Sequence, residues 1–241
     1  MDLGLSGKNA LVTGGAEGLG LAIVRAFAAE GANAGAADLK SPPYDAPCRY
    51  LPVDLGDVSR VEKLIGEAWE ALGSVDILVN NAGIWPTAWL TEMATDHWER
   101  TMRINLTAPM ILCREFARAC RERKREGVVL NVVSQAAFVG ARSGHADYAA
   151  SKAGLVNLTR TMTGELARHG IRVNALAPGM METSMSAEAL AERRDSYLER
   201  IPLGRVADPA EVADVAVFLC SRRAGYIAGA TVDVSGGMLL H

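Results

Sequence analysis

The sequence predicts an α/β fold in which a single doubly wound parallel sheet carries helices on both faces. Three observations support this fold class. Short apolar runs alternate with longer amphipathic segments along the chain. A glycine-rich turn directly follows the first apolar run. The chain has 241 residues, 49% of them hydrophobic, which is enough to bury the core of a large α/β domain.

The first half of the chain contains four apolar runs that are short enough to be buried strands. The second of these runs consists of small residues rather than bulky ones. Two segments between the runs have apolar residues three and four apart, which is the spacing of an amphipathic helix. We expect strands at residues 10–12, 34–37, 50–53 and 77–79, and helices at residues 19–30 and 61–72.

The same alternation continues in the second half. The pattern over residues 95–123 fits one or two long helices, and residues 187–200 form a charged helical stretch. Strands that alternate with helices of this length indicate a parallel sheet that is covered on both faces. We expect further strands at residues 128–133, 173–177 and 230–234, and further helices at residues 148–168 and 209–220.

Residues 1–241 are expected to form one domain. No internal repeat, low-complexity stretch or polar linker interrupts the alternating pattern. The proline-rich segment at residues 41–47 is expected to be a loop, because both of its flanks belong to the same pattern.

Composition argues against several classes of function. The 25 basic and 28 acidic residues give a formal charge of −3, which removes the usual electrostatic case for nucleic-acid binding. No apolar run is long enough for a membrane span, and the N-terminus does not resemble a signal peptide. The four cysteines are far apart and the four histidines are dispersed, so we expect a cytoplasmic protein with neither a disulfide framework nor a metal site.

The glycine-rich turn at residues 13–20 lies between the first expected strand and the first expected helix. Gly14, Gly18 and Gly20 allow a tight turn and a close approach of the backbone to a pyrophosphate. The helix that begins there offers unpaired N–H groups and the positive end of its dipole. This strand–turn–helix context predicts a dinucleotide site.

Asp38 lies 18 residues after Gly20, at the end of the second expected strand. In a dinucleotide fold, a carboxylate there accepts hydrogen bonds from the adenosine ribose. The same carboxylate repels a 2′-phosphate, and Glu17 adds a second negative charge in the glycine loop. We therefore predict NAD(H) rather than NADP(H) as the cofactor.

Tyr148 and Lys152 are four residues apart in an expected helix, so they face the same way. An ammonium beside a phenol favours the phenolate, and we expect it to lower the pKa of Tyr148 and to make that residue an acid–base group. Ser134 follows an expected strand, where its hydroxyl can hydrogen-bond a substrate oxygen beside Tyr148. Asn105 lies in a mid-chain helix, where its amide serves either the chemistry or helix packing.

The chain resembles the short-chain dehydrogenase/reductase superfamily, in its branch of roughly 250 residues, because it contains an ordered series of motifs. The resemblance runs from about Leu5 to the C-terminus. The motifs are Thr13-Gly14-x-x-x-Gly18-x-Gly20, Asp54-Leu55, Asn80-Asn81-Ala82-Gly83, Asn105, Ser134, Tyr148-x-x-x-Lys152, Pro178-Gly179-x-x-x-Thr183, Ile201-Pro202-Leu203-Gly204-Arg205 and Gly236-Gly237.

This resemblance implies a Rossmann fold, a homotetramer and a catalytic set. In that set Tyr148 exchanges the proton, Lys152 holds the nicotinamide ribose and Ser134 orients the substrate oxygen. Asn105 anchors a water that links Lys152 to solvent. The cofactor-binding set combines residues predicted above with residues that the resemblance implies: Gly14, Glu17, Gly18, Leu19, Gly20, Asp38, Asp54, Leu55, Asn81, Ala82, Gly83, Tyr148, Lys152, Pro178, Gly179, Met181 and Thr183.

The chain departs from the family pattern at several places, among them a single serine in Val132-Val133-Ser134 and a spacing of fourteen residues from Ser134 to Tyr148, one more than the commonest. Only 16 residues separate Asp38 from Asp54, so the helix that is usual between these strands is expected to be a short loop. Ser235 stands where an aspartate is frequent before the final glycine pair.

The substrate pocket is expected to be walled by residues 84–90, 135–147 and 180–198, with a mobile lid at about residues 180–200. Arg142 and His145 either bind an anionic or polyhydroxylated substrate or face solvent as ordinary loop residues. His97 is expected to be structural. The candidate substrate residues are Trp85, Arg142, His145, Met180 and Met185.

Three functions remain open. The leading hypothesis is an NAD-dependent dehydrogenase of a small secondary alcohol, polyol or sugar, or a reductase of the matching ketone or lactone. The second is a reductase of a 3-oxoacyl carrier-protein thioester, against which Glu17 and Asp38 argue because such enzymes generally use NADPH. The third is a cofactor-bound sensor without turnover, which has no need of Asn105, Ser134, Tyr148 and Lys152.

Overall fold

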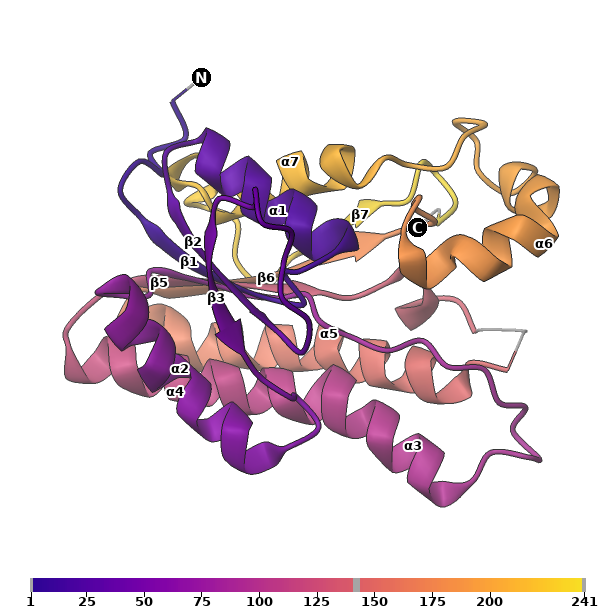
Figure 1. Cartoon of the computed structure of the whole chain (residues 1–241), viewed down its shortest axis with the longest axis horizontal. Coiled ribbons are helices and arrows are strands. Elements are labelled where there is room, and N and C mark those ends of the chain that lie inside the picture. The colour runs from indigo at the N-terminus through magenta and orange to yellow at the C-terminus, as the bar shows by residue number, and fades with distance from the viewer. Residues whose placement is uncertain (1, 141–143, 240–241) are drawn as a thin grey trace.

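A computed structural model describes residues 2–140 and 144–239 of the chain. Its centre is a parallel sheet of seven strands in the order β3-β2-β1-β4-β5-β6-β7 (Figure 1). This confirms the predicted doubly wound fold class. The strands are β1 (Asn9–Thr13), β2 (Asn33–Asp38), β3 (Cys48–Pro52), β4 (Ile77–Asn80), β5 (Gly127–Val132), β6 (Ile171–Pro178) and β7 (Thr231–Val234).

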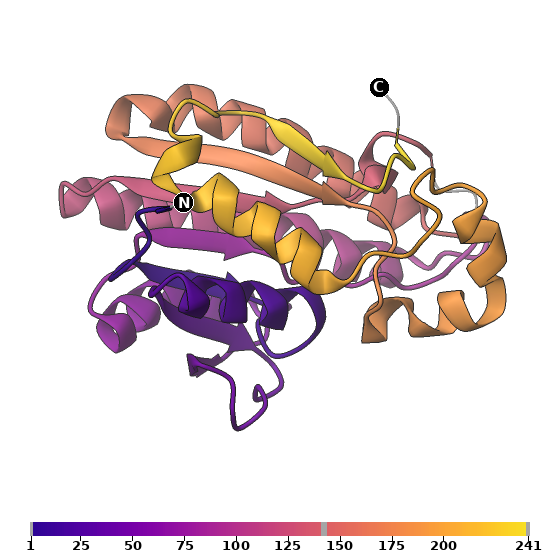
Figure 2. The ribbon, with the colours of Figure 1, turned by 90° about the horizontal axis from the view of Figure 1, so that it is seen from above.

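Helices cover both faces of this sheet, and each face has its own apolar core (Figures 1 and 2). Helices α1 and α7 pack on one face, whereas α2, α4 and α5 pack on the other. Helix α6 lies beyond one end of the sheet, away from both layers. The helices are α1 (Gly18–Ala29), α2 (Val58–Leu72), α3 (Thr95–Met102), α4 (Ala108–Glu122), α5 (Ala146–Leu166), α6 (Ala187–Leu198) and α7 (Pro209–Cys220).

Local sequence explains where these elements begin and end. The central strands β1 and β4 are completely buried, as expected for apolar runs with helices on both sides. Asp57 caps α2 by accepting hydrogen bonds from two backbone N–H groups, and Gly73 ends the helix in the left-handed conformation. Asp208 and Glu211 form a capping box around Pro209 at the start of α7.

The predicted elements agree with the observed ones to within a few residues at their ends. No helix lies between β2 and β3, which confirms the expected loop there. The segment predicted as one or two helices over residues 95–123 is two helices, α3 and α4, joined by a π-helical turn at Arg103–Thr107. Sequence periodicity did not reveal this turn, because one extra residue shifts the helical pattern only locally.

The order of the strands reverses between β1 and β4. The chain winds outward from β1 through β2 to β3, and then from β4 through β5 to β7. The connections leave on opposite sides of this point, so a crevice opens at the carboxyl ends of the strands. None of the helices in the part of the chain that the structure describes is both long and apolar enough to cross a membrane.

Candidate active site

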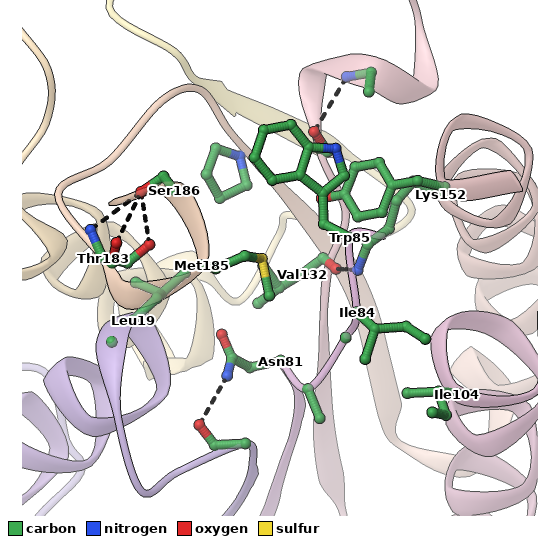
Figure 3. Close-up of a pocket in the computed structure, with 18 of the residues that line it drawn as sticks. Leu19, Asn81, Ile84, Trp85, Ile104, Val132, Lys152, Thr183, Met185 and Ser186 are labelled. Atoms are coloured by element: carbon green, nitrogen blue, oxygen red, sulfur yellow. Dashed lines mark hydrogen bonds between the residues drawn. The ribbon is translucent and has the colours of Figure 1, made fainter. Parts of the chain in front are cut away.

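A cleft of about 1630 Å³ opens at the carboxyl ends of the strands and continues beneath α6. With the exception of Arg142, which lies outside the described residues, every candidate site residue except Asn105 lines this cleft. Asn105 lies directly behind the wall, completely buried. Figure 3 shows how side chains from separate segments, among them Asn81, Trp85, Lys152 and Thr183, converge on it.

The glycine loop forms the floor of the cleft where α1 begins. A Cβ atom on Gly20 would lie 1.9 Å from the carbonyl oxygen of Gly14, so only glycine fits at position 20. Gly14 and Gly18 have φ angles of 64° and 53°, which favour glycine. No side chain in the described residues caps the N-terminus of α1 at Glu17. The loop therefore presents unpaired backbone N–H groups to the cleft, as an anion site requires.

A hydrogen-bonded lock ties this loop to the end of β4. Thr13 Oγ1 accepts hydrogen bonds of 3.1 Å from the backbone N–H groups of both Asn81 and Ala82. The Asn81 side-chain amide donates to the carbonyl oxygens of Thr13 and Gly14, and Figure 3 draws one of these two hydrogen bonds. Asn81 thus positions the loop, and its neighbour Ala82 leaves no space for a Cβ on Gly14.

The end of the cleft that contains Asp38 is acidic. The Asp38 carboxylate accepts hydrogen bonds from the backbone N–H groups of Ala16, at 3.0 Å, and Lys40, at 3.1 Å, which fix its orientation. The Lys40 ammonium lies 3.0 Å from the Glu17 carboxylate on the exposed rim. Lys40, the cation closest to Asp38 along the chain, is therefore already paired with a carboxylate, and these three residues together keep one negative charge. Sequence reasoning missed the contact between Lys40 and Glu17.

Asp54 and Leu55 lie on the same side, after β3. Asp54 is exposed and accepts a hydrogen bond of 2.7 Å from the backbone N–H of Gly56, which holds the turn. Leu55 is only 8% exposed, and most of its side chain belongs to the apolar core. Both residues line the cleft, as the resemblance implied.

Tyr148, Lys152 and Ser134 meet where α5 passes the end of β5. Lys152 is buried, and its Nζ donates a hydrogen bond of 2.8 Å to the carbonyl oxygen of Val132 (Figure 3). The same Nζ lies 5.7 Å from the centroid of the Tyr148 ring. The Ser134 hydroxyl accepts a hydrogen bond from the backbone N–H of Ala136 and also hydrogen-bonds the Tyr148 side chain.

The electrostatics of this cluster differ from the expectation. Burial raises the pKa of Tyr148, and the hydrogen bond from Ser134 offsets only part of that increase. Burial also lowers the pKa of Lys152 to about 8. The prediction that Lys152 makes Tyr148 acidic is therefore wrong for the protein without cofactor. Loss of hydration is the larger effect at both residues, and the ammonium is committed to the Val132 carbonyl.

Asn105 lies in the π-helical turn and is completely buried. Its amide accepts a hydrogen bond of 2.9 Å from the backbone N–H of Ile84 and donates one of 3.0 Å to the Ile84 carbonyl. It also donates to the Ser151 hydroxyl of α5 at 3.2 Å. A Cβ on Gly83 would lie 3.2 Å from Asn105 Oδ1 and 3.4 Å from Lys152 Nζ, so a glycine lets these two groups approach. The water-anchoring role of Asn105 stays a prediction.

A buried carboxylate holds the start of α5 against α3. Asp147, which directly precedes Tyr148, is 0% exposed. It accepts a hydrogen bond of 2.6 Å from the Thr101 hydroxyl and lies 3.3 Å from His97 Nε2. This contact explains the structural role expected of His97. Sequence reasoning missed Asp147 and Thr101, because neither residue belongs to a motif.

The base of the lid is joined to the end of β6 and to the glycine loop. Gly179 packs directly on Ser235, since a Cβ on Gly179 would lie 2.8 Å from Ser235 Cα. The Ser235 hydroxyl accepts a hydrogen bond of 3.0 Å from the backbone N–H of Leu239, which gives this unexplained residue a role in closing the C-terminal turn. Thr183 faces Gly18, and Ser186 bonds back to Thr183 and to the Met181 carbonyl (Figure 3). Pro178 ends β6 beside this junction.

The expected substrate wall contains a pair of contacting rings, tilted by 32° to one another, that the sequence did not predict. The Trp85 and His145 rings have centroids 4.7 Å apart, and Trp85 lies 6.2 Å from the Tyr148 ring. His145 is only 4% exposed, and its Nδ1 hydrogen-bonds the Pro86 carbonyl at 2.9 Å. The alternative of a solvent-facing His145 is therefore wrong. Met180 and Met185 line the same wall, and Met185 is 51% exposed.

One face of the lid was also missed. Arg193, Ser196, Tyr197 and Arg200 line the cleft. Arg193 lies at a kink in α6 and Arg200 lies beyond its last residue, Leu198, so helical periodicity in the sequence does not identify these residues as one face.

Comparisons with known proteins agree with this architecture. A family model described as enoyl-(acyl carrier protein) reductase matches residues 14–239. The 3-oxoacyl-(acyl-carrier-protein) reductase of Thermotoga maritima is 35% identical over 98% of this chain and 99% of its own length. The 3beta-hydroxysteroid dehydrogenase 1 of Eggerthella lenta is 39% identical over 98% and 95%.

Among solved structures, a putative 2-deoxy-D-gluconate 3-dehydrogenase from Agrobacterium tumefaciens with bound NADP is 36% identical. It matches with a TM-score of 0.91 over 98% of both chains. These matches span nearly the whole chain and accompany the expected fold and motifs. The protein therefore belongs to the short-chain dehydrogenase/reductase superfamily and is an oxidoreductase of CH–OH groups.

Proposed function

We propose that the protein is an NAD(H)-dependent enzyme that interconverts a small secondary alcohol, polyol or sugar with the matching ketone or lactone. The observation that carries the choice of cofactor is the Asp38 carboxylate, which two backbone N–H groups hold at the adenosine end of the cleft. A 2′-phosphate beside this carboxylate would meet a repulsion of about 4 kcal/mol at 4 Å and an effective dielectric constant of 20. Solvent at the rim reduces that value, so we expect a preference for NAD(H) of about 10–100-fold.

The cleft fits a dinucleotide in shape as well as in charge. Gly20 leaves no space for a side chain, and the uncapped start of α1 suits a pyrophosphate. Asp38, Asp54 and Leu55 form the adenosine end. The remaining cofactor contacts come from Asn81, Ala82, Gly83, Pro178, Gly179, Met181 and Thr183, all of which line the cleft.

When bound, the nicotinamide supplies or accepts the hydride. Tyr148 donates the proton to the substrate oxygen in reduction and takes it back in oxidation, while Ser134 orients that oxygen. The raised pKa of Tyr148 keeps its proton in place at neutral pH, which suits the donor role in reduction. Lys152 holds the ribose, and Asn105 fixes the segment at Ile84 that passes beneath it.

The NADP in the Agrobacterium structure does not decide the cofactor of this chain, because local charge determines this preference. Here Lys40 is the cation closest to Asp38 along the chain, and Glu17 neutralises it at 3.0 Å. Glu17, Asp38 and Lys40 together carry one negative charge.

Steady-state kinetics with a panel of alcohols and sugars test this proposal. We expect kcat/KM to be about 10–100-fold higher with NAD⁺ than with NADP⁺, and Asp38→Ser to remove most of that difference. Asp45→Ser is the matched control, because Asp45 is exposed on the loop after β2, where it pairs with Arg25. A preference of the wild type for NADP⁺ contradicts the choice of cofactor.

A second candidate function, reduction of a 3-oxoacyl thioester, is favoured by the identity to the Thermotoga reductase. An assay with acetoacetyl thioesters and NADPH distinguishes the two. Lack of turnover with every substrate, combined with intact cofactor binding, would instead favour the sensor. Cytoplasmic location and a homotetramer are part of the proposal, and sedimentation velocity tests the latter.

A further inference from the structure

The face of the lid that borders the cleft is basic, although the lid as a whole is not. Residues 187–200 contain four carboxylates and three guanidinium groups. Of these seven charged side chains, only Arg193 and Arg200 line the cleft. The five that do not are Glu188, Glu192, Arg194, Asp195 and Glu199.

The polar groups on this face are suited to bind an anion. Arg193, Ser196, Tyr197 and Arg200 all carry hydrogen-bond donors and line the same cleft, with Arg200 just beyond the end of α6. The backbone leaves helical geometry at Arg193, where φ is −137° and ψ is 28°, so this arginine lies at a kink in α6. A guanidinium binds carboxylate and phosphate groups through two parallel hydrogen bonds.

Neither arginine has an acidic partner among the described residues, and both are exposed. Arg194, the next residue on α6, instead pairs with Glu182 at 2.8 Å on the outside of the lid. Arg194 on the outer side of the lid therefore has a carboxylate partner, whereas the two arginines that line the cleft have none among the described residues.

Lys152 also lines the cleft, but its ammonium is bonded to the Val132 carbonyl; the remaining charges of the cleft are balanced or lie elsewhere. Glu17, Asp38 and Asp54 belong to the adenosine end, and Asp96 and Glu99 on α3 are accompanied by Arg100 and Arg103. The substrate wall itself is formed by Trp85, Val139, Met180 and Met185, together with the buried His145. The cleft that contains Tyr148 therefore has an apolar wall and, from the lid, two guanidinium groups that have no acidic partner among the described residues.

We propose, on the basis of the proposed function, that the substrate is an anion. It is a hydroxy acid or a phosphate ester of a polyol, whose carboxylate or phosphate Arg193 and Arg200 bind while its carbinol group lies at Tyr148. This assigns the recognition of charge to the lid rather than to His145, whose Nδ1 is already bonded to Pro86.

The test compares pairs of compounds that differ only in charge, with the variant Arg193→Gln/Arg200→Gln. The pairs are 3-hydroxybutyrate and its methyl ester, gluconate and glucitol, and glycerol 3-phosphate and glycerol. Binding of each compound to the enzyme–NADH complex is measured by calorimetry, and kcat/KM is measured with NAD⁺. Arg194→Gln is the matched control, because it removes a guanidinium from the outer face of the same helix.

We expect at least one anion to bind at least 10-fold more tightly than its neutral partner, and the double variant to abolish that difference. Arg194→Gln retains it, and NADH affinity is the same in all three proteins. Raising the salt concentration weakens binding of the anion only.

The proposal is overturned if no anion binds better than its neutral partner, or if the double variant keeps the preference. It is also overturned if the double variant loses NADH affinity, because the arginines then serve the cofactor. Failure of the proposed function appears differently, as a wild type that binds no nicotinamide cofactor at all.

Discussion

The two ends of the cleft differ in charge and in how their side chains are held. At the adenosine end, two backbone N–H groups fix Asp38, and Thr13 and Asn81 lock the glycine loop. At the lid end, Arg193 and Arg200 are exposed and have no acidic partner among the described residues. The end at Asp38 is thus preformed by hydrogen bonds, whereas we propose that the end at the lid becomes ordered only when a substrate binds.

The largest expected effect lies between the two ends, at Tyr148. Tyr148→Phe removes the proton donor but keeps the ring that packs beside Trp85. We expect kcat to fall by about 10²–10⁴-fold or more, while NADH affinity stays within about twofold of the wild type. Stopped-flow and fluorescence titration measure the two quantities. Unchanged turnover would show that Tyr148 is not the proton donor.

The preformed end is tested by adding one methyl group. Gly20→Ala places a Cβ against the Gly14 carbonyl, and we expect at least a 10-fold loss of NADH affinity as the loop is displaced. Gly66→Ala is the control, because Gly66 lies within α2 and its Cβ would meet nothing within 4 Å. That change is expected to raise the unfolding free energy by about 0.5–1 kcal/mol and to leave binding unchanged. Equal NADH affinity in the Gly20→Ala and Gly66→Ala variants would contradict the claim that the glycine loop has no space for a side chain at position 20.

Burial of the Lys152 ammonium removes its hydration and should therefore lower the free energy of unfolding. Its pKa falls from 10.5 to about 8 on folding, so the folded state resists protonation of this amine. The resulting cost is about 3 kcal/mol, is fully present below pH 8 and disappears as the pH rises toward 10.5. Lys152→Met should therefore stabilise the cofactor-free protein at pH 7, by about 1–3 kcal/mol after loss of the hydrogen bond to Val132.

Urea unfolding from pH 7 to pH 10.5 measures this effect, and the advantage of the variant should shrink across the upper part of that range. Lys63→Met, on the exposed side of α2, is the control and should change the unfolding free energy little at any pH. A variant that is less stable than the wild type at pH 7 would show that burial of the Lys152 ammonium does not destabilise the folded protein.

A smaller effect is expected at the contact between α3 and α5. Thr101→Val removes the 2.6 Å hydrogen bond to the buried Asp147, and we expect a loss of about 1–3 kcal/mol in unfolding free energy. Thr161→Val removes a similar hydroxyl on the exposed side of α5, where its partner is the Asn157 carbonyl, and should cost less than 0.5 kcal/mol. If thermal unfolding showed the same loss of unfolding free energy in both variants, the buried hydrogen bond to Asp147 would contribute no more than the exposed one.

The sequence predicted those features that depend on residues close together in the chain. The alternation of apolar runs predicted the sheet, and the glycine loop, Asp38, Tyr148 and Lys152 are short-range patterns whose spacing carries their meaning. The Trp85–His145 stack and the Asp147–Thr101 hydrogen bond join segments 60 and 46 residues apart, and no local pattern reports such contacts. The raised pKa of Tyr148 was missed for the same reason, since burial depends on the whole fold.

The most direct test of the account is a titration of the resting protein with NADH and with NADPH, followed by calorimetry. The account predicts saturable binding of NADH with a Kd about 10–100-fold below that of NADPH, and a difference that Asp38→Ser removes. Absence of saturable binding, or tighter binding of NADPH, would contradict it.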